Sequence, residues 1–260
     1  MLAERAGVKF RSAVAGSALV AAALVWSQTK PTVAQSTTPA PEATQTIDER
    51  YTQIIRQNLQ DPRITTELVD HLPASGTVPT PLMFFGRAVG TPSELTYAKD
   101  IHRYYEALAK ASPRAKYLKI GTTEEGRDIV LLAIADEATI ESLDRYKDML
   151  RALTDPRRTT EAQAQQILQT AKPIYYAISG IHSPETGGPE MLIELAYRLI
   201  VEETPFIQNI RRNVITLIRP VLEVDGREKQ VDAYYFLGFN AILNWNDLDA
   251  GKASTSNVTK

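Results

Sequence analysis

Ile178–Glu190, with the sequence ISGIHSPETGGPE, joins an apolar run to a strongly helical segment. The run before it, Ile174–Ile178 (IYYAI), predicts a buried strand, and Gly188-Pro189 opens the helix. His182 and Glu185 therefore lie on a strand-to-helix connection. In open α/β sheets ligands bind at the carboxyl ends of strands, so this connection is the candidate site of the chain.

Strands and helices alternate around this connection. Two β-type runs joined by a glycine-bounded turn predict an antiparallel pair, and strand, helix, strand with nearly all-apolar strands predicts a parallel pair covered on both faces. We expect an α/β fold, a three-layer sandwich with a mixed, mostly parallel sheet. The expected strands are 115–120, 128–134, 173–179 and 213–219, and the expected helices are 97–110, 138–153, a Gln-rich segment near 160–171, and 188–203.

The first 34 residues have the layout of a secretory signal. Lys9 and Arg11 precede the apolar stretch Ser12–Trp26, and small residues follow up to Ala34. An uncleaved anchor is disfavoured, because the 15 residues of that stretch are fewer than the ~20 that a helix needs to cross a bilayer. We expect residues 1–34 to be a cleaved signal peptide, with no stable membrane anchor and an exported (periplasmic or extracellular) product.

Composition divides the rest of the chain. A segment rich in Pro, Ser, Thr and Ala without apolar period predicts a disordered linker. Thr46 and Glu49 form a capping-box pattern ahead of a helical stripe, which predicts the start of folded structure. The expected parts are a linker at 35–45, an N-terminal extension at 46–91, the main domain at 92–240 and a polar tail at 241–260.

The composition excludes several kinds of site. The chain has no cysteine, so a metal must be bound by His, Asp or Glu. Of its 29 basic and 31 acidic residues, four basic and one acidic lie in residues 1–34, which leaves 25 and 30 and a net charge of −5. No basic stripe remains to follow a nucleic-acid backbone, and we expect no nucleic-acid partner. The sequence does not indicate an oligomeric state.

Three motifs occur in a fixed order: Gly121–Arg127 (GTTEEGR), Gly180–Glu185 (GIHSPE) and Val224–Gly226 (VDG). Alone, His-x-x-Glu is a weak signal, because a single histidine at a strand end is more often structural than a ligand. Together, over residues 92–240, the three resemble the first half of the zinc metallocarboxypeptidases of the carboxypeptidase A type. In that family a T-x-E-G-R turn, an H-x-x-E zinc motif and an N-P-D-G turn follow one another at similar spacing.

The resemblance implies that His182 and Glu185 are two of three protein ligands to one zinc ion. Imidazole and carboxylate are suitable zinc ligands, and three protein ligands with an open water position make a catalytic site. Zinc lowers the pKa of the bound water and polarises the scissile carbonyl. The implied activity is hydrolysis of C-terminal peptide bonds in peptide or protein substrates.

The chain also departs from the family pattern. Pro184 stands where the H-x-R-E form of the motif has arginine, and Glu223-Val224 replaces Asn-Pro. No histidine follows His182 and no arginine follows Arg227, so the third zinc ligand and the Asn-Arg pair for the substrate carboxylate are missing. The general-base glutamate is expected beyond Lys260, and no catalytic residue is identified in the chain.

These departures predict a truncated protein, either a fragment of a longer product or the result of a frameshift or early stop. The sheet would then be incomplete at its C-terminal side, with an exposed edge. We expect the chain alone to bind zinc weakly and to lack peptidase activity. His102, at the expected edge of a buried helical stripe, or His71, whose position is not inferred, would complete the site only within ~4 Å of His182 and Glu185.

Two other functions compete with this interpretation. A non-catalytic fragment or binding module could have the same half-fold. A serine hydrolase is disfavoured, because the chain has no Gly-x-Ser-x-Gly elbow. Tyr175-Tyr176 and Tyr234-Tyr235 are candidate aromatic platforms for a substrate, but strand positions favour core packing.

Overall fold

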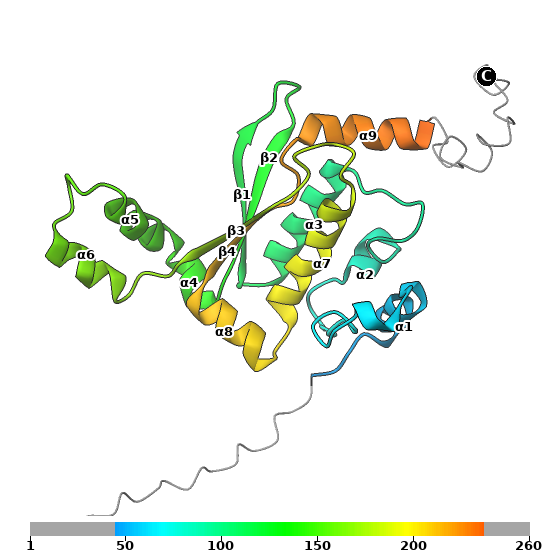
Figure 1. The fold of residues 1–260 in the computed structure, drawn as a ribbon, viewed down its shortest axis with the longest axis horizontal. Coiled ribbons are helices and arrows are strands. Elements are labelled where there is room, and N and C mark those ends of the chain that lie inside the picture. The colour runs from blue at the N-terminus through cyan, green and yellow to red at the C-terminus, as the bar shows by residue number, and fades with distance from the viewer. Residues whose placement is uncertain (1–44, 237–260) are drawn as a thin grey trace, which may run out of the picture. The chain divides into compact units, whose positions relative to one another are not determined.

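The computed structural model describes residues 45–236 (Figure 1). The expected signal peptide (1–34), the expected linker apart from Gln45, and the expected tail (241–260) lie outside the described residues. Within residues 45–236, every helix is too short or too polar to cross a lipid bilayer.

Helices and strands alternate along the described chain. The helices are α1 (Glu49–Asn58), η1 (Pro62–Ile64, a 3-10 turn), α2 (Pro81–Phe85), α3 (Ala98–Ala111), α4 (Glu137–Glu141), α5 (Leu143–Leu153), α6 (Glu161–Leu168), α7 (Gly187–Val201), α8 (Pro205–Asn213) and α9 (Val224–Phe236). The strands are β1 (Ala115–Thr122), β2 (Asp128–Ile134), β3 (Ile174–Ile178) and β4 (Ile215–Arg219). All four expected strands are present, with ends within two residues of the predicted ones.

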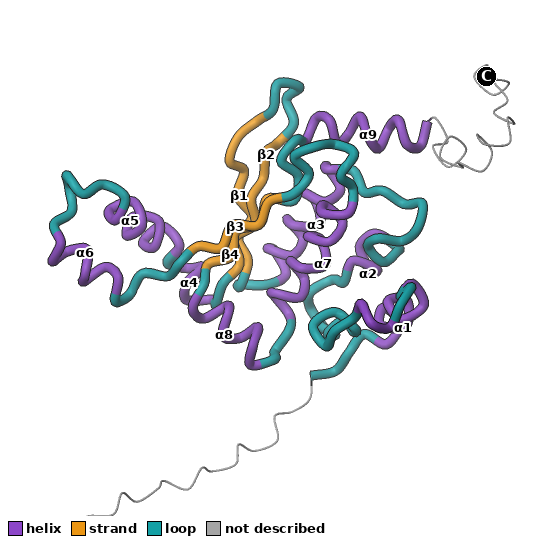
Figure 2. The backbone as a smooth tube through the Cα atoms, viewed as in Figure 1, coloured by secondary structure: helices purple, strands orange, loops and turns teal. Residues whose placement is uncertain are grey.

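The described strands form one mixed sheet in the order β1-β2-β4-β3 (Figure 2). The expected antiparallel β1–β2 pair and the expected parallel β3–β4 pair are both confirmed. β2 and β4 are antiparallel, so one of the three described pairings is parallel and the expected parallel majority is not found. The reason is that β1 and β2 form a hairpin that joins β4 through β2, which leaves β3-α7-α8-β4 as the parallel unit.

The main core lies between one face of the sheet and helices α3 and α7, which run side by side in Figure 1. The apolar stripe of α3 is fully buried, as its helical spacing predicts. The expected N-terminal extension, residues 46–91, contributes to the same core through Tyr51 and Leu72, both 0% exposed. The helices that precede α3 therefore pack on the domain that contains the motifs.

The opposite face of the sheet carries a small second cluster of Ala133, Ala135, Ile140 and Ile215, with Leu143 and Tyr146 against it. Among the described residues, α4 and the start of α5 form the helical layer on this side. The α/β class and the open mixed sheet are confirmed. Covering of both faces is not found at β3, where four of the five residues are exposed.

Strand β3 is the open edge that we expected, since no described strand pairs with its outer side. Its tyrosines are not core residues: Tyr175 is 64% and Tyr176 48% exposed. The core interpretation is wrong here because no described helix covers the strand. It is wrong also for Tyr234-Tyr235, which belongs to α9 rather than to a strand, and in which Tyr235 is 44% exposed.

Three local details differ from prediction. The first helix begins at Glu49, with the Asp48 side chain accepting from the Tyr51 N–H at 2.8 Å, so Thr46 is not its cap. The expected helix 138–153 is divided at Ser142 into α4 and α5. Helix α9 was not predicted, because its polar and apolar residues follow no helical period and Gly226 lies in its first turn.

Candidate metal centre

The connections after β3 and β4 lie side by side at one edge of the sheet. Because these strands are parallel, their carboxyl ends meet there. Three backbone hydrogen bonds join the two connections: the Ser179 N–H to the Arg219 oxygen at 3.3 Å, the Leu222 N–H to the Ser179 oxygen at 2.8 Å, and the Glu223 N–H to the Gly180 oxygen at 3.0 Å. Backbone hydrogen bonds therefore hold the start of the connection after β3 to the connection after β4.

Gly180 allows the chain to leave β3 in this direction. Its φ is +62°, in the left-handed region that favours glycine. A Cβ at this position would lie 3.2 Å from Cγ of Pro189 and 3.6 Å from Cα of Val221. The turn thus begins with close contact to the first turn of α7 and to the connection after β4.

His182 and Glu185 form the two ends of an exposed turn. The Glu185 N–H donates to the His182 oxygen at 3.0 Å. Both residues are exposed, and neither side chain makes a hydrogen bond or ion pair with another described residue. An imidazole and a carboxylate without protein partners, three residues apart on a turn at a sheet edge, are available to bind a metal ion.

The other two histidines do not complete a metal site. His71 lies beside Asp70, with Nδ1 at 2.5 Å from its carboxylate. His102 on α3 is 8% exposed, more buried than the expected edge position, and its Nε2 has no hydrogen-bond partner within residues 45–236. Burial lowers the pKa of His102 to about 4, although the nearby Asp128 opposes the shift. Residues 45–236 contain no group of three His, Cys, Asp or Glu side chains placed to hold a metal.

The glycine-bounded turn between β1 and β2 binds Asp225. Its Thr123 hydroxyl donates to Oδ1 of Asp225 at 2.8 Å, Nη1 of Arg127 donates to the same oxygen at 2.7 Å, and the Glu125 N–H donates to Oδ2 at 3.3 Å. Burial alone would raise the pKa of Asp225, but the hydrogen bonds from Arg127 and Thr123 outweigh it and hold the pKa below its ordinary value. Asp225 is thus an ionised anchor for the turn.

Gly226, the residue after Asp225, lies in close contact with the His-x-x-Glu turn. A Cβ on Gly226 would lie 2.1 Å from Oγ of Ser183 and 1.6 Å from Oε2 of Glu223, so the backbone approaches both side chains closely. Ser183, the neighbour of His182, donates to Oε2 of Glu223 at 3.0 Å. All three sequence motifs therefore meet at one edge of the sheet.

A family model of zinc carboxypeptidases matches residues 101–236, slightly more than half of the chain. The chain belongs to the zinc carboxypeptidase family. The resemblance inferred from the three motifs is confirmed, and the match covers most of the segment 92–240 on which it was based.

Other comparisons of this zinc carboxypeptidase family member are distant. The crystal structure of thrombin activatable fibrinolysis inhibitor is similar, with 16% identity and a TM-score of 0.37 over 68% of this chain. The chain spans about a third of the length of that protein, 33%. No curated protein matches.

Sequence reasoning missed a buried ion pair behind the zinc carboxypeptidase motifs. Glu190, in the first turn of α7, accepts from Nη2 of Arg227 at 2.9 Å and from the Thr96 N–H and hydroxyl, both at 2.7 Å. Arg227, in α9, also donates to the Thr96 oxygen at 3.0 Å from Nε and from Nη2. The pair joins the helix after the His-x-x-Glu turn to the helix that contains Asp225. The two residues are 37 positions apart in the sequence, and no local pattern connects them, so the sequence alone does not predict the pair.

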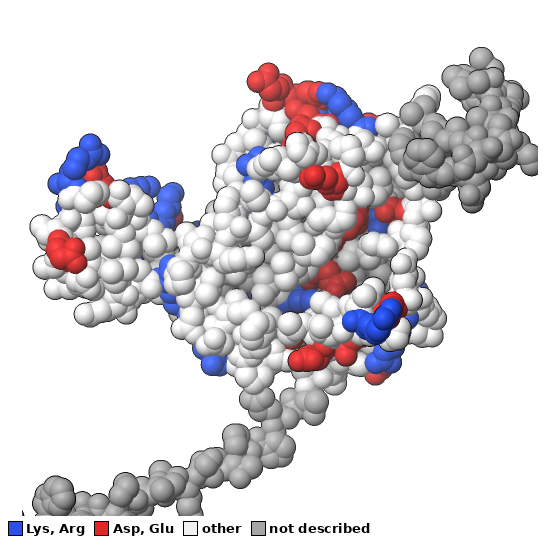
Figure 3. Space-filling model, viewed as in Figure 1, with Lys and Arg blue, Asp and Glu red and all other residues white. Residues whose placement is uncertain are grey.

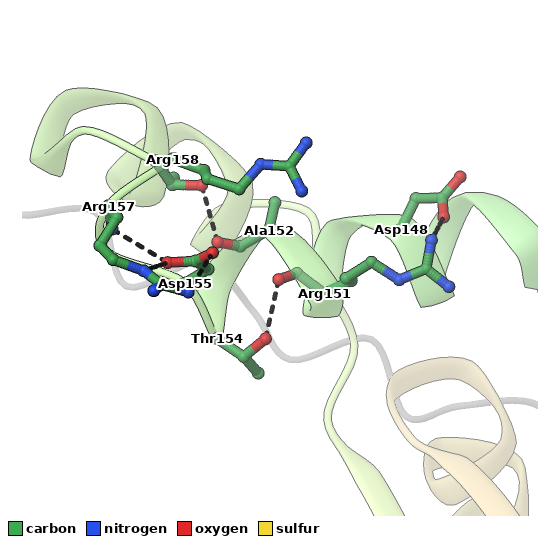
Figure 4. A pocket seen from close by; sticks show the side chains of 8 residues that line it. Asp148, Arg151, Ala152, Thr154, Asp155, Arg157 and Arg158 are labelled. Atoms are coloured by element: carbon green, nitrogen blue, oxygen red, sulfur yellow. Dashed lines mark hydrogen bonds and ion pairs between the residues drawn. The ribbon is translucent and has the colours of Figure 1, made fainter.

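A hollow of about 560 Å³ on the α5–α6 excursion contains none of the zinc carboxypeptidase motifs (Figure 4). Its charged side chains are largely paired with each other: Arg151 contacts Asp148 at 3.2 Å, and Arg157 contacts Asp155 at 2.8 Å. The hollow therefore contains none of the side chains that the family's motifs supply.

On the face shown in Figure 3, acidic and basic side chains are interspersed.

Proposed function

We propose that this chain is the zinc-binding first part of a secreted metallocarboxypeptidase, in which His182 and Glu185 are two of the protein ligands to one zinc ion. The observation that carries the proposal is the exposed turn at the carboxyl ends of β3 and β4, where neither side chain has a partner in the described part of the chain. The donors are an imidazole and a carboxylate, which suit zinc. Membership of the family supports the same assignment.

Zinc, when bound at such a site, lowers the pKa of a bound water and polarises a peptide carbonyl. The residues of the chain contribute to this chemistry by positioning the two donor side chains, His182 and Glu185. The backbone bonds between the connections after β3 and β4 hold the base of the turn, and the Glu185 N–H bond to the His182 oxygen fixes the spacing of the two residues. Peptides or proteins with a free C-terminal residue are the proposed substrates.

The coordination set is incomplete within residues 45–236, where no third His, Asp or Glu lies close enough to share the metal. We infer that the chain alone binds zinc weakly and has no peptidase activity, because affinity depends on completing the set. The same observation favours the second candidate, a non-catalytic binding module with this half-fold. We propose further that residues 1–34 direct export, that 35–45 is a linker and that 46–91 is an extension of the 92–240 domain.

Competition with a chromogenic chelator tests the zinc assignment. We expect weak zinc binding by the chain that is lost in both His182→Ala and Glu185→Ala. His71→Ala is the matched control and should keep the binding, because His71 already contacts Asp70 and lies outside the turn. Equal zinc binding by the chain and by His182→Ala would rule out the assigned ligand.

Peptidase activity distinguishes the two candidate functions. If the native product continues into a segment that supplies the third ligand and the general base, that longer protein should release C-terminal amino acids from peptides. A chelator should abolish this activity and added zinc should restore it. A longer product that binds peptides without cleaving them would favour the binding module.

A further inference from the structure

We propose that Asp225 is a positioning residue for the His182–Glu185 turn, and that it transmits the position of the β1–β2 hairpin tip to that turn. The inference rests on the proposed zinc function and assigns a role to a residue that does not itself contact the metal ligands. Four observations support it, and each concerns a different set of contacts.

The first observation is the number of bonds on one carboxylate. Asp225 accepts from the Thr123 hydroxyl, the Arg127 guanidinium and the Glu125 N–H, so both of its oxygens are used by the hairpin tip. Its side chain is only 13% exposed. A charge-assisted contact of this kind is about twice as strong as a neutral hydrogen bond. The tip of the hairpin and the start of α9 are therefore held as one unit.

The second observation is that the hairpin tip is organised around this contact. The Arg127 N–H donates to the Thr123 hydroxyl at 3.0 Å, while Arg127 and Lys229 both contact the Glu125 carboxylate. These contacts hold the pKa of Glu125 below its ordinary value, mainly through the hydrogen bond from Arg127. The charges of two carboxylates, Glu125 and Asp225, and of two basic side chains, Arg127 and Lys229, thus balance one another at the tip. Asp225 is the least exposed of the four side chains.

The third observation is the close approach of the next residue, Gly226, to the turn. A side chain at this position requires Ser183 and Glu223, which are hydrogen-bonded to each other, to move. A shift of Asp225 must therefore move Gly226 relative to Ser183. Since Ser183 directly follows His182, such a shift changes the position of the proposed imidazole ligand.

The fourth observation concerns the other contacts that hold the turn in place. The backbone bonds to Ser179 and Gly180 fix the start of the turn, and α7 fixes its end. In the described structure, the middle of the turn makes one side-chain hydrogen bond to the rest of the protein, the bond from Ser183 to Glu223. Glu223, which accepts this bond, is two residues from Asp225 in the chain, so Asp225 acts on the turn through the segment that contains Glu223.

Hydrogen exchange of the Glu185 amide measures the turn without zinc, because this N–H bonds the His182 oxygen. We expect Asp225→Ala to speed this exchange about tenfold, the factor that corresponds to losing one charge-assisted hydrogen bond. Asp225→Asn should give a smaller effect, because it keeps an acceptor for Arg127 but presents an amide to the Glu125 N–H. Zinc affinity should fall by about tenfold in Asp225→Ala, as for other residues that orient metal ligands.

Asp232→Ala is the matched control. Asp232 is also an aspartate on α9 that accepts a bond from a distant element, the Tyr97 hydroxyl at 2.9 Å, but it does not touch the turn. It should leave both the exchange rate and the zinc affinity unchanged. If Asp225→Ala and Asp232→Ala behave alike, the positioning role is overturned.

A glycine pair provides a second test that does not depend on Asp225. Gly226→Ala should speed exchange at Glu185 and weaken zinc binding, whereas Gly187→Ala, which meets nothing within 4 Å, should do neither. Unchanged exchange in Gly226→Ala overturns the inference. If the unmodified chain binds no zinc but the exchange results hold, the zinc function fails and the positioning of the turn stands.

Discussion

Nη2 of Arg227 donates to Oε1 of Glu190 at 2.9 Å, and the two side chains are only 1% and 7% exposed. The pair links the first turn of α7, which follows the His-x-x-Glu turn, to the first turn of α9, which contains Asp225. Among the described residues Nη1 of Arg227 has no hydrogen-bond partner, and the guanidinium bonds Glu190 and the Thr96 oxygen through Nε and Nη2.

We predict that Glu190→Ala destabilises the protein by about 3–5 kcal/mol, because it leaves the Arg227 charge buried without the carboxylate to which it is hydrogen-bonded. Urea unfolding at neutral pH measures the change. Arg212→Ala is the control: Arg212 is exposed and bonds Gln208 within its own helix, so its loss should cost less than about 0.5 kcal/mol. Equal stability of Glu190→Ala and the unchanged protein would contradict the role of the pair.

The stability of the protein should depend on His102 at mildly acidic pH. Burial lowers the pKa of His102 in the folded state to about 4, below the ordinary value of 6.5. The unfolded chain therefore takes up a proton first as pH falls, and stability that is fully present above pH 6.5 is lost progressively toward pH 4. The loss attributable to this residue is up to about 3 kcal/mol.

Urea unfolding at several pH values tests this effect. His102→Gln removes the titrating group, so the difference in stability between the variant and the unchanged protein should vary between pH 6.5 and 4. A constant difference for His102→Gln across this range would contradict the prediction.

The open edge of β3 should make the chain prone to association. β3 has no charged residue, and its apolar side chains are exposed beside unpaired backbone groups, which is the arrangement that promotes edge-to-edge pairing. We expect Tyr176→Lys to reduce light scattering of concentrated solutions. Met191→Lys adds the same charge at a residue of similar exposure, 54% against 48%, away from the sheet edge, and should have a smaller effect. Equal reductions in light scattering by the two variants would show that association depends on net charge and not on the open edge of β3.

Export should remove the first segment of the chain. Mass spectrometry of the mature protein is expected to place its N-terminus near Gln35, after the small residues that follow the apolar stretch. An intact Met1 on a protein recovered from the cytoplasm would contradict the proposed localisation.

The sequence was most informative where the period of apolar residues was strong. Helix α3 was predicted because its buried residues recur at helical spacing, and β1–β4 because apolar runs end at glycines or prolines. The place of His182 and Glu185 at the end of a parallel strand followed from the same pattern.

What could not be predicted depends on contacts between distant segments. Whether Tyr175 and Tyr176 are buried is decided by what lies over β3, not by their own apolar character. The bond of Asp225 to the hairpin tip and the pair of Glu190 with Arg227 leave no local pattern. Glu223 was recognised only as a departure from the family, whereas the structure gives it a contact to Ser183.

The bond between Thr123 and Asp225 spans 102 residues of sequence. At synthesis rates of about 5–20 residues per second, the hairpin tip therefore exists for about 5–20 s before its partner has been made. During that interval the tip carries Glu125 and Arg127 without the carboxylate that they surround in the finished protein. His182 is also made before Asp225, so the proposed zinc ligand reaches its final position only when one of the last described segments to be synthesised arrives.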